Sequence, residues 1–147
     1  MSTPGMTDDD RRHVTIEYFK RFDAGKDVLD LFADDAYVYF PKHRPARNLE
    51  EVRQLFGDVG SLFASIVHEV PYFNHIVQGE RVVVEGTTYG ALAHGQEWRA
   101  GQGLGGRFCN VFEVRDDKIQ RLHIYLDPDY ADQDTARYPW LDNAAQR

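Results

Sequence analysis

Apolar positions recur at helical spacing in the first part of the chain. The segment 8–23 carries an apolar stripe and follows Thr7, whose hydroxyl suits a helix N-cap. Its first three residues are aspartates, which favour the positive end of a helix, and Ala24 and Gly25 supply a stop. The same criteria predict a short helix over 28–33, a turn at 34–35, a strand over 36–41, a basic loop over 42–47 and a helix over 49–66 capped by Asn48.

After residue 66 the pattern changes to an alternation with a period of two, which is typical of strands. Pro71 lies early in this region and indicates an edge or bulge position. The predicted elements are a strand over 67–78, a turn at Gly79 and Glu80, a strand over 81–93, an irregular glycine-rich connection over 93–106 and a hairpin over 106–128 that turns at 115–118.

One polar residue interrupts an apolar row of the last hairpin. Phe108, Asn110, Phe112 and Val114 share one face of the first arm, because side chains of a strand alternate between its two faces. An amide that points into an apolar surface loses water and needs a partner. Asn110 is therefore either a structural hydrogen bonder or the polar floor of a pocket.

Helices followed by consecutive strands indicate an α+β domain in which helices cover one face of an antiparallel sheet. The chain has 147 residues, which fits one domain, and we expect that domain to span 8–129. Residues 1–7 are expected to be a mobile lead. Residues 130–147 form a polar tail with several aromatic side chains, which we expect to dock on the domain or on a partner subunit.

Composition and charge narrow the possible partners. The formal net charge is −7, so we expect neither a nucleic-acid nor an anionic-membrane surface, which need clustered lysine and arginine. No run of eighteen apolar residues is present to span a bilayer. Cys109 is the single cysteine, which excludes an intrachain disulfide framework and fits a reducing cytoplasm, where we expect the protein.

The order of elements is similar to one known fold. The chain has a long helix, a short helix, the strand FADDAYVYFP, a third helix and the closing hairpin VFEVRDDKIQRLHIYLDP. The stretch from Asp10 to Asp129 resembles the nuclear transport factor two-like superfamily, and within it the SnoaL-like branch of small enzymes. The resemblance implies a cone: a curved antiparallel sheet whose concave face is covered by helices and encloses a pocket.

The resemblance to ketosteroid isomerases and polyketide cyclases implies roles for individual residues. Tyr18 matches the oxyanion-binding tyrosine of the isomerases, and Asn110 stands where they have a second oxyanion donor. An amide can donate that hydrogen bond without an abnormal pKa. Their catalytic base corresponds to Phe40, which cannot accept a proton. The SnoaL-like cyclases place an acid-base aspartate at the position of Asn110, which cannot titrate.

Scytalone dehydratase, a third relative, is closer in its polar pattern. It has an asparagine matching Asn110, an aspartate matching Asp23 and a histidine matching His68. The histidine that its aspartate orients falls near Leu92, two residues from His94. The resemblance therefore implies that His68 or His94 is the acid-base group, that Asp23 orients it, and that Tyr18 and Asn110 bind a substrate oxygen. Such a site needs no metal and no organic cofactor.

Two functions of different classes follow. The first is a cofactor-free lyase, isomerase or cyclase that acts on a small, mostly apolar oxygenated molecule. The second is a non-catalytic module of the same fold that binds a small molecule or dimerises. Arg121, His123 and Tyr125 lie on the opposite face of the last strand, and we expect a homodimer through this outer face of the sheet. The residues expected to line the substrate pocket are Phe40, Phe108, Phe112, Leu122 and Trp98.

Overall fold

The structure is a computed structural model that describes residues 5–103 and 105–127. These residues form two α-helices, α1 (Asp8–Asp23) and α2 (Leu49–Gly60), and two 3-10 helices (Leu29–Leu31 and Val70–Tyr72). The strands of the described part are β1 (Phe32–Tyr39), β2 (Phe63–His68), β3 (Asn74–Gln78), β4 (Arg81–Leu92), β5 (Glu97–Arg99), β6 (Arg107–Arg115) and β7 (Lys118–Leu126). The predicted tail over 130–147 lies outside the described residues.

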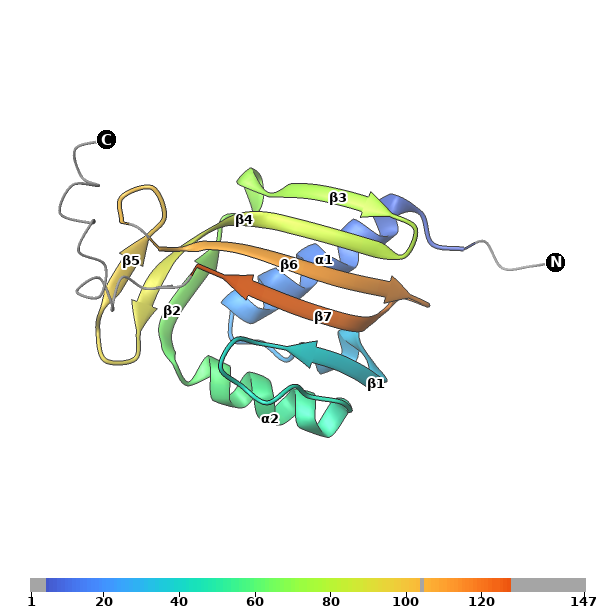
Figure 1. Cartoon of the computed structure of the whole chain (residues 1–147), viewed down its shortest axis with the longest axis horizontal. Coiled ribbons are helices and arrows are strands. Elements are labelled where there is room, and N and C mark those ends of the chain that lie inside the picture. Colours follow the sequence, from blue (N-terminus) through green and yellow to red (C-terminus); the bar gives the residue numbers. More distant parts are fainter. Residues whose placement is uncertain (1–4, 104, 128–147) are drawn as a thin grey trace.

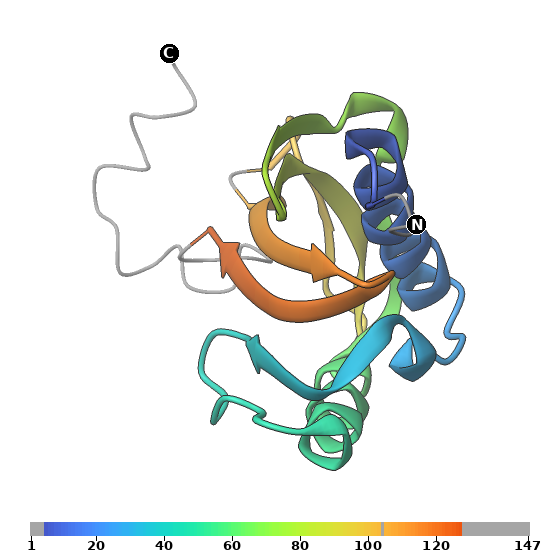
Figure 2. The same ribbon diagram turned by 90° about the vertical axis from the view of Figure 1, so that its right-hand side faces the viewer.

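The strands form one strongly curved sheet. Its order is β1-β7-β6-β4-β2, and β3 and β5 also pair with β4. The β1–β7 pair is parallel and the other pairs are antiparallel. The first half of β4 pairs with β3 and β6, and its second half pairs with β2 and β5. Figure 1 shows α1 lying across the sheet, and Figure 2 shows the strands bending around the helices. The α+β class and the curved sheet are confirmed.

The first helix begins and ends where the sequence predicts. Thr7 accepts a hydrogen bond from the backbone nitrogen of Asp10, and the Asp10 carboxylate accepts one from the backbone nitrogen of Thr7. Gly25 adopts a left-handed conformation with φ of 68° just after the helix. Met6 packs against the core, and its carbonyl accepts a hydrogen bond from Arg11.

The middle of the chain departs from the predicted boundaries. The predicted helix over 28–33 is only the 3-10 turn, because Phe32 already pairs with Ile119 of β7. The predicted turn at 34–35 lies inside β1, at an irregularity of the pairing. The helix predicted over 49–66 ends at Gly60, and Phe63 starts β2 because β4 supplies backbone partners there. The strand predicted over 67–78 is divided by the 3-10 turn that contains Pro71.

The predicted hairpin over 106–128 is confirmed as β6 and β7. Asp116 and Asp117 form its turn and both have positive φ values, of 54° and 60°. The inward side chains of both arms are buried and form the floor of the core beneath α1. In the described part of the chain, no helix is long and apolar enough to cross a membrane.

Candidate functional site

A small cavity lies inside the cone, between the two helices and the hairpin. Its volume is about 20 Å³, which is close to the space that one water molecule needs. Tyr18 of α1, Phe40 after β1 and Phe108 of β6 contribute aromatic rings to its wall. His68 and Asn110 contribute polar groups. The cavity therefore brings together four of the seven predicted pocket and oxyanion positions and one of the two candidate histidines.

His68 is held by two hydrogen bonds to one carboxylate. Its ring nitrogen Nδ1 lies 2.6 Å from Oδ1 of Asp23, and its backbone nitrogen donates to Oδ2 of Asp23 at 2.7 Å. Only 11% of the His68 side chain and 16% of the Asp23 side chain are exposed. Because Asp23 occupies Nδ1, Nε2 is the ring nitrogen left for other partners.

The fold explains why these two residues meet. Asp23 is the last residue of α1, and His68 is the last residue of β2, which packs beside the end of that helix. The rings of Phe19 and Phe108 lie 4.8 Å and 5.1 Å from the His68 ring and restrict its orientation. A carboxylate and two aromatic rings thus fix the imidazole at the edge of the cavity.

Asn110 is the polar group on the floor of the cavity. Its side chain projects from β6 between Phe108 and Phe112, and only 2% of the residue is exposed. Oδ1 of Asn110 is buried without a hydrogen-bond partner among the described residues. Leaving such an atom unpaired costs about 1–3 kcal/mol. Among the described residues, the amide oxygen is therefore not a satisfied structural acceptor.

Three residues predicted to line the pocket lie elsewhere. Phe112 and Leu122 are fully buried and face each other across the hairpin, deeper under α1 than the cavity, where the Phe112 ring packs against Tyr18 and Phe19. Trp98 belongs to a small separate cluster with Ile66. None of the three lines the cavity, because Phe112 and Leu122 belong to the packed core and the pairing of β5 with β4 places Trp98 in the separate cluster.

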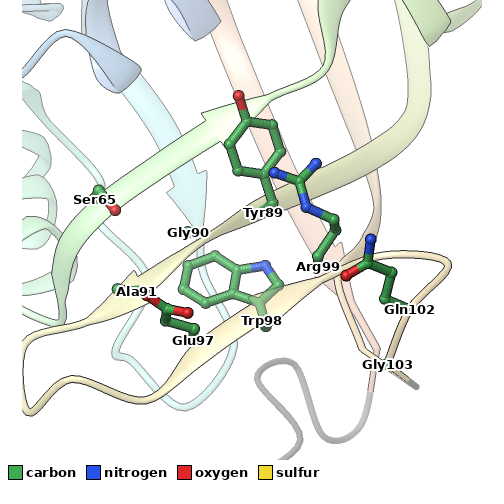
Figure 3. A pocket seen from close by; sticks show the side chains of 9 residues that line it. All are labelled: Ser65, Tyr89, Gly90, Ala91, Glu97, Trp98, Arg99, Gln102 and Gly103. Carbon is green, nitrogen blue, oxygen red and sulfur yellow. The ribbon is translucent and has the colours of Figure 1, made fainter.

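Trp98 instead lies beside a polar hollow on the β4–β5 arm of the sheet. The hollow has a volume of about 450 Å³, and Tyr89, Glu97, Arg99 and Gln102 also line it. Figure 3 shows the Arg99 guanidinium beside the Tyr89 ring, and its carbon lies 3.9 Å from the ring centroid. The indole nitrogen of Trp98 donates to Oγ1 of Thr88 at 3.0 Å. None of these residues lines the interior cavity.

His94, the alternative acid-base candidate, is exposed in the turn between β4 and β5. The backbone of that turn is closed by a hydrogen bond from Gly95 to Leu92. The Asp23 carboxylate, which was expected to orient the acid-base group, bonds His68. Of the two candidate histidines, the structure places His68 at the cavity.

Several cavity residues were missed by sequence reasoning. They are apolar residues of α1, α2, β2 and β7: Phe22, Phe56, Val59, Phe63, Ile66, Ile124 and Leu126. Phe22 lies one helical turn after Tyr18, so helical spacing from a predicted pocket residue could have found it. Phe63 and Ile66 were predicted to belong to the helix over 49–66, which ends at Gly60 in the structure. They belong to β2 instead, so helical spacing could not show which way their side chains point.

Two other histidines are buried in part but face no carboxylate partner. Burial, with a smaller contribution from Arg12, lowers the pKa of His75. Burial, with a smaller contribution from Arg121, lowers the pKa of His123. Among the residues 5–103 and 105–127, no group of three or more His, Cys, Asp or Glu side chains is arranged to hold a metal ion.

The chain belongs to the SnoaL-like domain family, which matches residues 15–122. This match covers ten of the twelve residues that line the cavity, including Asn110, and the His68–Asp23 pair. No curated protein matches the chain in sequence. The family assignment confirms the resemblance to the nuclear transport factor two-like superfamily.

Solved structures share the fold at low sequence identity. A nuclear transport factor two-like protein from Anabaena variabilis is 21% identical with a TM-score of 0.69, over 88% of this chain and 98% of that chain. A candidate polyketide cyclase from Xanthomonas campestris pv. campestris is 16% identical with a TM-score of 0.68, over 81% and 91%. TerC, co-crystallised with polyporic acid, is 16% identical with a TM-score of 0.65, over 80% and 92%. At such identities the similarity establishes the fold.

Proposed function

We propose that this chain is a cofactor-free lyase, isomerase or cyclase that acts on a small, mostly apolar oxygenated molecule, with His68 as its acid-base group. The observation that carries the proposal is the His68–Asp23 pair at the edge of a cavity floored by Asn110. A histidine oriented by a carboxylate suits proton transfer near neutral pH. The candidate cyclase and the TerC complex support a small-molecule function, because they share this fold.

The proposed reaction begins with removal of a proton from the carbon next to a substrate carbonyl. Nε2 of His68 takes the proton, and the electron pair of the broken C–H bond forms a C=C bond while the carbonyl oxygen becomes an oxyanion. The amide N–H of Asn110 donates a hydrogen bond to this oxygen, and the Tyr18 hydroxyl is proposed as a second donor. Asp23 stabilises the imidazolium that forms.

The fate of the enolate decides the reaction type. In an isomerisation, the imidazolium returns the proton to a different carbon. In a dehydration, it protonates a β-hydroxyl group, which leaves as water. In a cyclisation, the enolate carbon attacks a second carbonyl of the same molecule and the imidazolium protonates the resulting alkoxide. Each route consumes the proton that His68 removed, so none needs another reactant.

The test is an activity screen over enolisable and β-hydroxy carbonyl compounds, followed by substitution. With a compound that turns over, His68→Gln should reduce kcat by about 10²- to 10⁴-fold. His94→Gln should leave kcat unchanged, because this residue is exposed in a turn. Asn110→Ala should lower kcat by about 10²-fold or more, as loss of an oxyanion donor does. Full activity in His68→Gln together with loss in His94→Gln would overturn the assignment.

The alternative proposal is a binding module without catalysis. It is favoured by the closed interior, where the wall rings leave a cavity of only about 20 Å³. In a binder, the unpaired Asn110 oxygen would accept a hydrogen bond from a ligand hydroxyl, and His68 would be a second polar contact. Saturable binding of compounds that show no turnover, lost in Asn110→Ala, would favour this alternative.

We further propose a homodimer through the outer face of the sheet. An apolar row crosses this face through paired positions Ile76, Val83, Val111, His123 and Tyr39. Ile76 is 58% exposed, although it is a large apolar side chain. A second row pairs Arg81 with Glu113 and Glu113 with Arg121. An apolar row beside charges of both signs suits a self-complementary contact.

A further inference from the structure

A second hollow, here called the vestibule, lies outside the cavity between the end of α1, the end of α2 and the start of β2. Its volume is about 360 Å³. Phe22, Phe56, Phe63 and Ile66 line both the vestibule and the interior cavity. These four side chains, here called the partition, are the wall that the two hollows share.

The partition consists of side chains that can rotate. The rings of Phe22 and Phe56 meet edge to face with centroids 6.0 Å apart. Phe22 and Phe56 are each only partly buried, and both line the open space of the vestibule. Rotation of such side chains is fast compared with enzyme turnover. The cavity can therefore enlarge by moving rings rather than the backbone.

Two glycines keep the vestibule wide. Gly57 and Gly60 lie on the wall that α2 presents to the vestibule. A Cβ atom built at either position meets nothing within 4 Å. Glycine inside a helix costs about 0.5–1 kcal/mol relative to alanine. Glycine is not required at either position by the backbone conformation or by close packing. A larger residue there would therefore fill the open space of the vestibule.

The acid-base pair lies at the junction of the two hollows. Asp23 lines the vestibule, whereas His68 lines the cavity. A molecule long enough to pass the partition would place its inner end near His68 and Asn110 and keep its outer part beside α2. A volume of several hundred Å³ is what ring-containing ligands occupy in protein pockets.

We propose that the vestibule admits the substrate and holds the unreactive part of a flat, ring-containing, hydroxylated molecule, whose reacting end reaches His68 and Asn110 when the partition moves aside. This inference rests on the proposed function for the identity of the inner site. It adds the route, the shape of the ligand and the residues that select for it: Gly57 and Gly60, which carry no side chain, and the rings of Phe22 and Phe56, all of which line the vestibule.

The test uses 2-naphthol, a flat fluorescent molecule whose single hydroxyl can donate to Oδ1 of Asn110. Fluorescence titration of the full chain gives its Kd. Gly57→Leu should raise the Kd at least about tenfold, which corresponds to about 1.4 kcal/mol. Gly57→Ala is the matched control and should stay within about twofold of the unchanged protein, since a methyl group leaves the vestibule open. Gly60→Leu repeats the block from a second position, and thermal melts verify that each variant is folded.

Association kinetics distinguish the role of the partition from the role of the vestibule. Phe56→Ala removes one partition ring and should raise the association rate of 2-naphthol in stopped-flow measurements. Phe40→Ala, which enlarges the cavity wall away from the vestibule, should not raise it. An unchanged rate in Phe56→Ala would show that the partition does not control access.

The remaining outcomes distinguish this inference from the proposed function. If Gly57→Leu and Gly60→Leu bind 2-naphthol normally while Asn110→Leu does not, the inner site stands and the route is wrong. If the unchanged protein does not bind 2-naphthol, the ligand class is wrong. If the glycine variants lose binding but His68→Gln retains turnover, the vestibule stands and the acid-base assignment fails.

Discussion

The two faces of the β6–β7 hairpin place a histidine in different surroundings. On the inner face, Asn110 and the apolar residues around it are shielded by α1, and a neighbouring histidine, His68, is anchored by Asp23. On the outer face, His123 stacks against Tyr37 with ring centroids 5.5 Å apart and contacts Arg121, whose Nη2 lies 3.2 Å from Nε2. Among the described residues, His68 has a carboxylate partner and lines the cavity, whereas His123 has no carboxylate partner and does not line the cavity.

The difference shows that a histidine becomes a candidate catalyst through its neighbours. The carboxylate of Asp23 fixes one ring nitrogen of His68 and leaves the other for a substrate. Burial and, to a smaller extent, the Arg121 guanidinium lower the pKa of His123, and the three tyrosine rings around it offer no carboxylate to orient the imidazole. In our proposals the inner face supplies the chemistry and the outer face supplies an apolar surface for association.

The largest expected effect on stability comes from the inner face. Phe112 is fully buried and contacts the rings of Tyr18 and Phe19. Phe112→Ala should lower the free energy of unfolding by about 3–5 kcal/mol, because it removes apolar contacts and leaves a cavity. Urea denaturation followed by circular dichroism measures this. A loss below about 1 kcal/mol would mean that the narrow end of the cone is not close-packed.

Asn110→Leu should act in the opposite direction. The Asn110 oxygen is buried without a partner, so an apolar side chain of similar size removes a desolvation cost. We expect the free energy of unfolding to rise by about 1 kcal/mol, while ligand binding or turnover is lost. Asn110→Asp is the contrasting variant and should destabilise the fold near neutral pH, because it buries a charge. A marked loss of stability in Asn110→Leu would indicate a structural role instead.

The contrast between the faces was partly visible in the sequence. Alternation placed Asn110 inward and His123 outward, because a strand has a fixed period of two. The capping pattern likewise fixed both ends of α1, and with them the position of Asp23. Local rules succeed where the determining residues are neighbours in the chain.

Long-range strand pairing determined the features that the sequence did not predict. Phe63 and Ile66 continue a helical apolar pattern, yet β4 captures them as a strand, and this places their side chains between the vestibule and the cavity. Trp98 was expected to line the pocket, but pairing of β5 with β4 carries it onto a separate arm. Neither outcome follows from spacing, because each depends on where β4 bends.

A smaller effect concerns pH and the outer face. Burial, with a smaller contribution from Arg121, lowers the pKa of His123, whose neighbours also include Tyr37, Tyr39 and Tyr125. Below the unfolded-state pKa of about 6.5, the unfolded chain therefore binds a proton that the folded chain does not. This contribution to stability is complete above that pH and is lost as the pH falls toward the lower folded pKa.

The measurement is the free energy of unfolding at a series of pH values between about 7.5 and 5. His123→Phe keeps an aromatic ring in the stack and removes the titrating group, so its stability should fall less over this range than that of the unchanged protein. His75→Gln should act in the same direction, because burial also lowers the pKa of His75. An unchanged slope in His123→Phe would show that this ring does not resist protonation in the fold.

The smallest effect on the stability of the fold is expected at Tyr125, which is 49% exposed on the outer face. Tyr125→Arg should change the free energy of unfolding by no more than about 0.5 kcal/mol when measured on dilute protein. It should nevertheless weaken the proposed homodimer, because it places a guanidinium beside Arg121 and His123 in both copies. Sedimentation velocity over a concentration series measures this, with Leu62→Arg as the control at an exposed apolar residue after α2. If both variants and the unchanged protein associate equally, the outer face is a solvated surface rather than a dimer contact. The two faces would then differ only in that the inner face encloses a site.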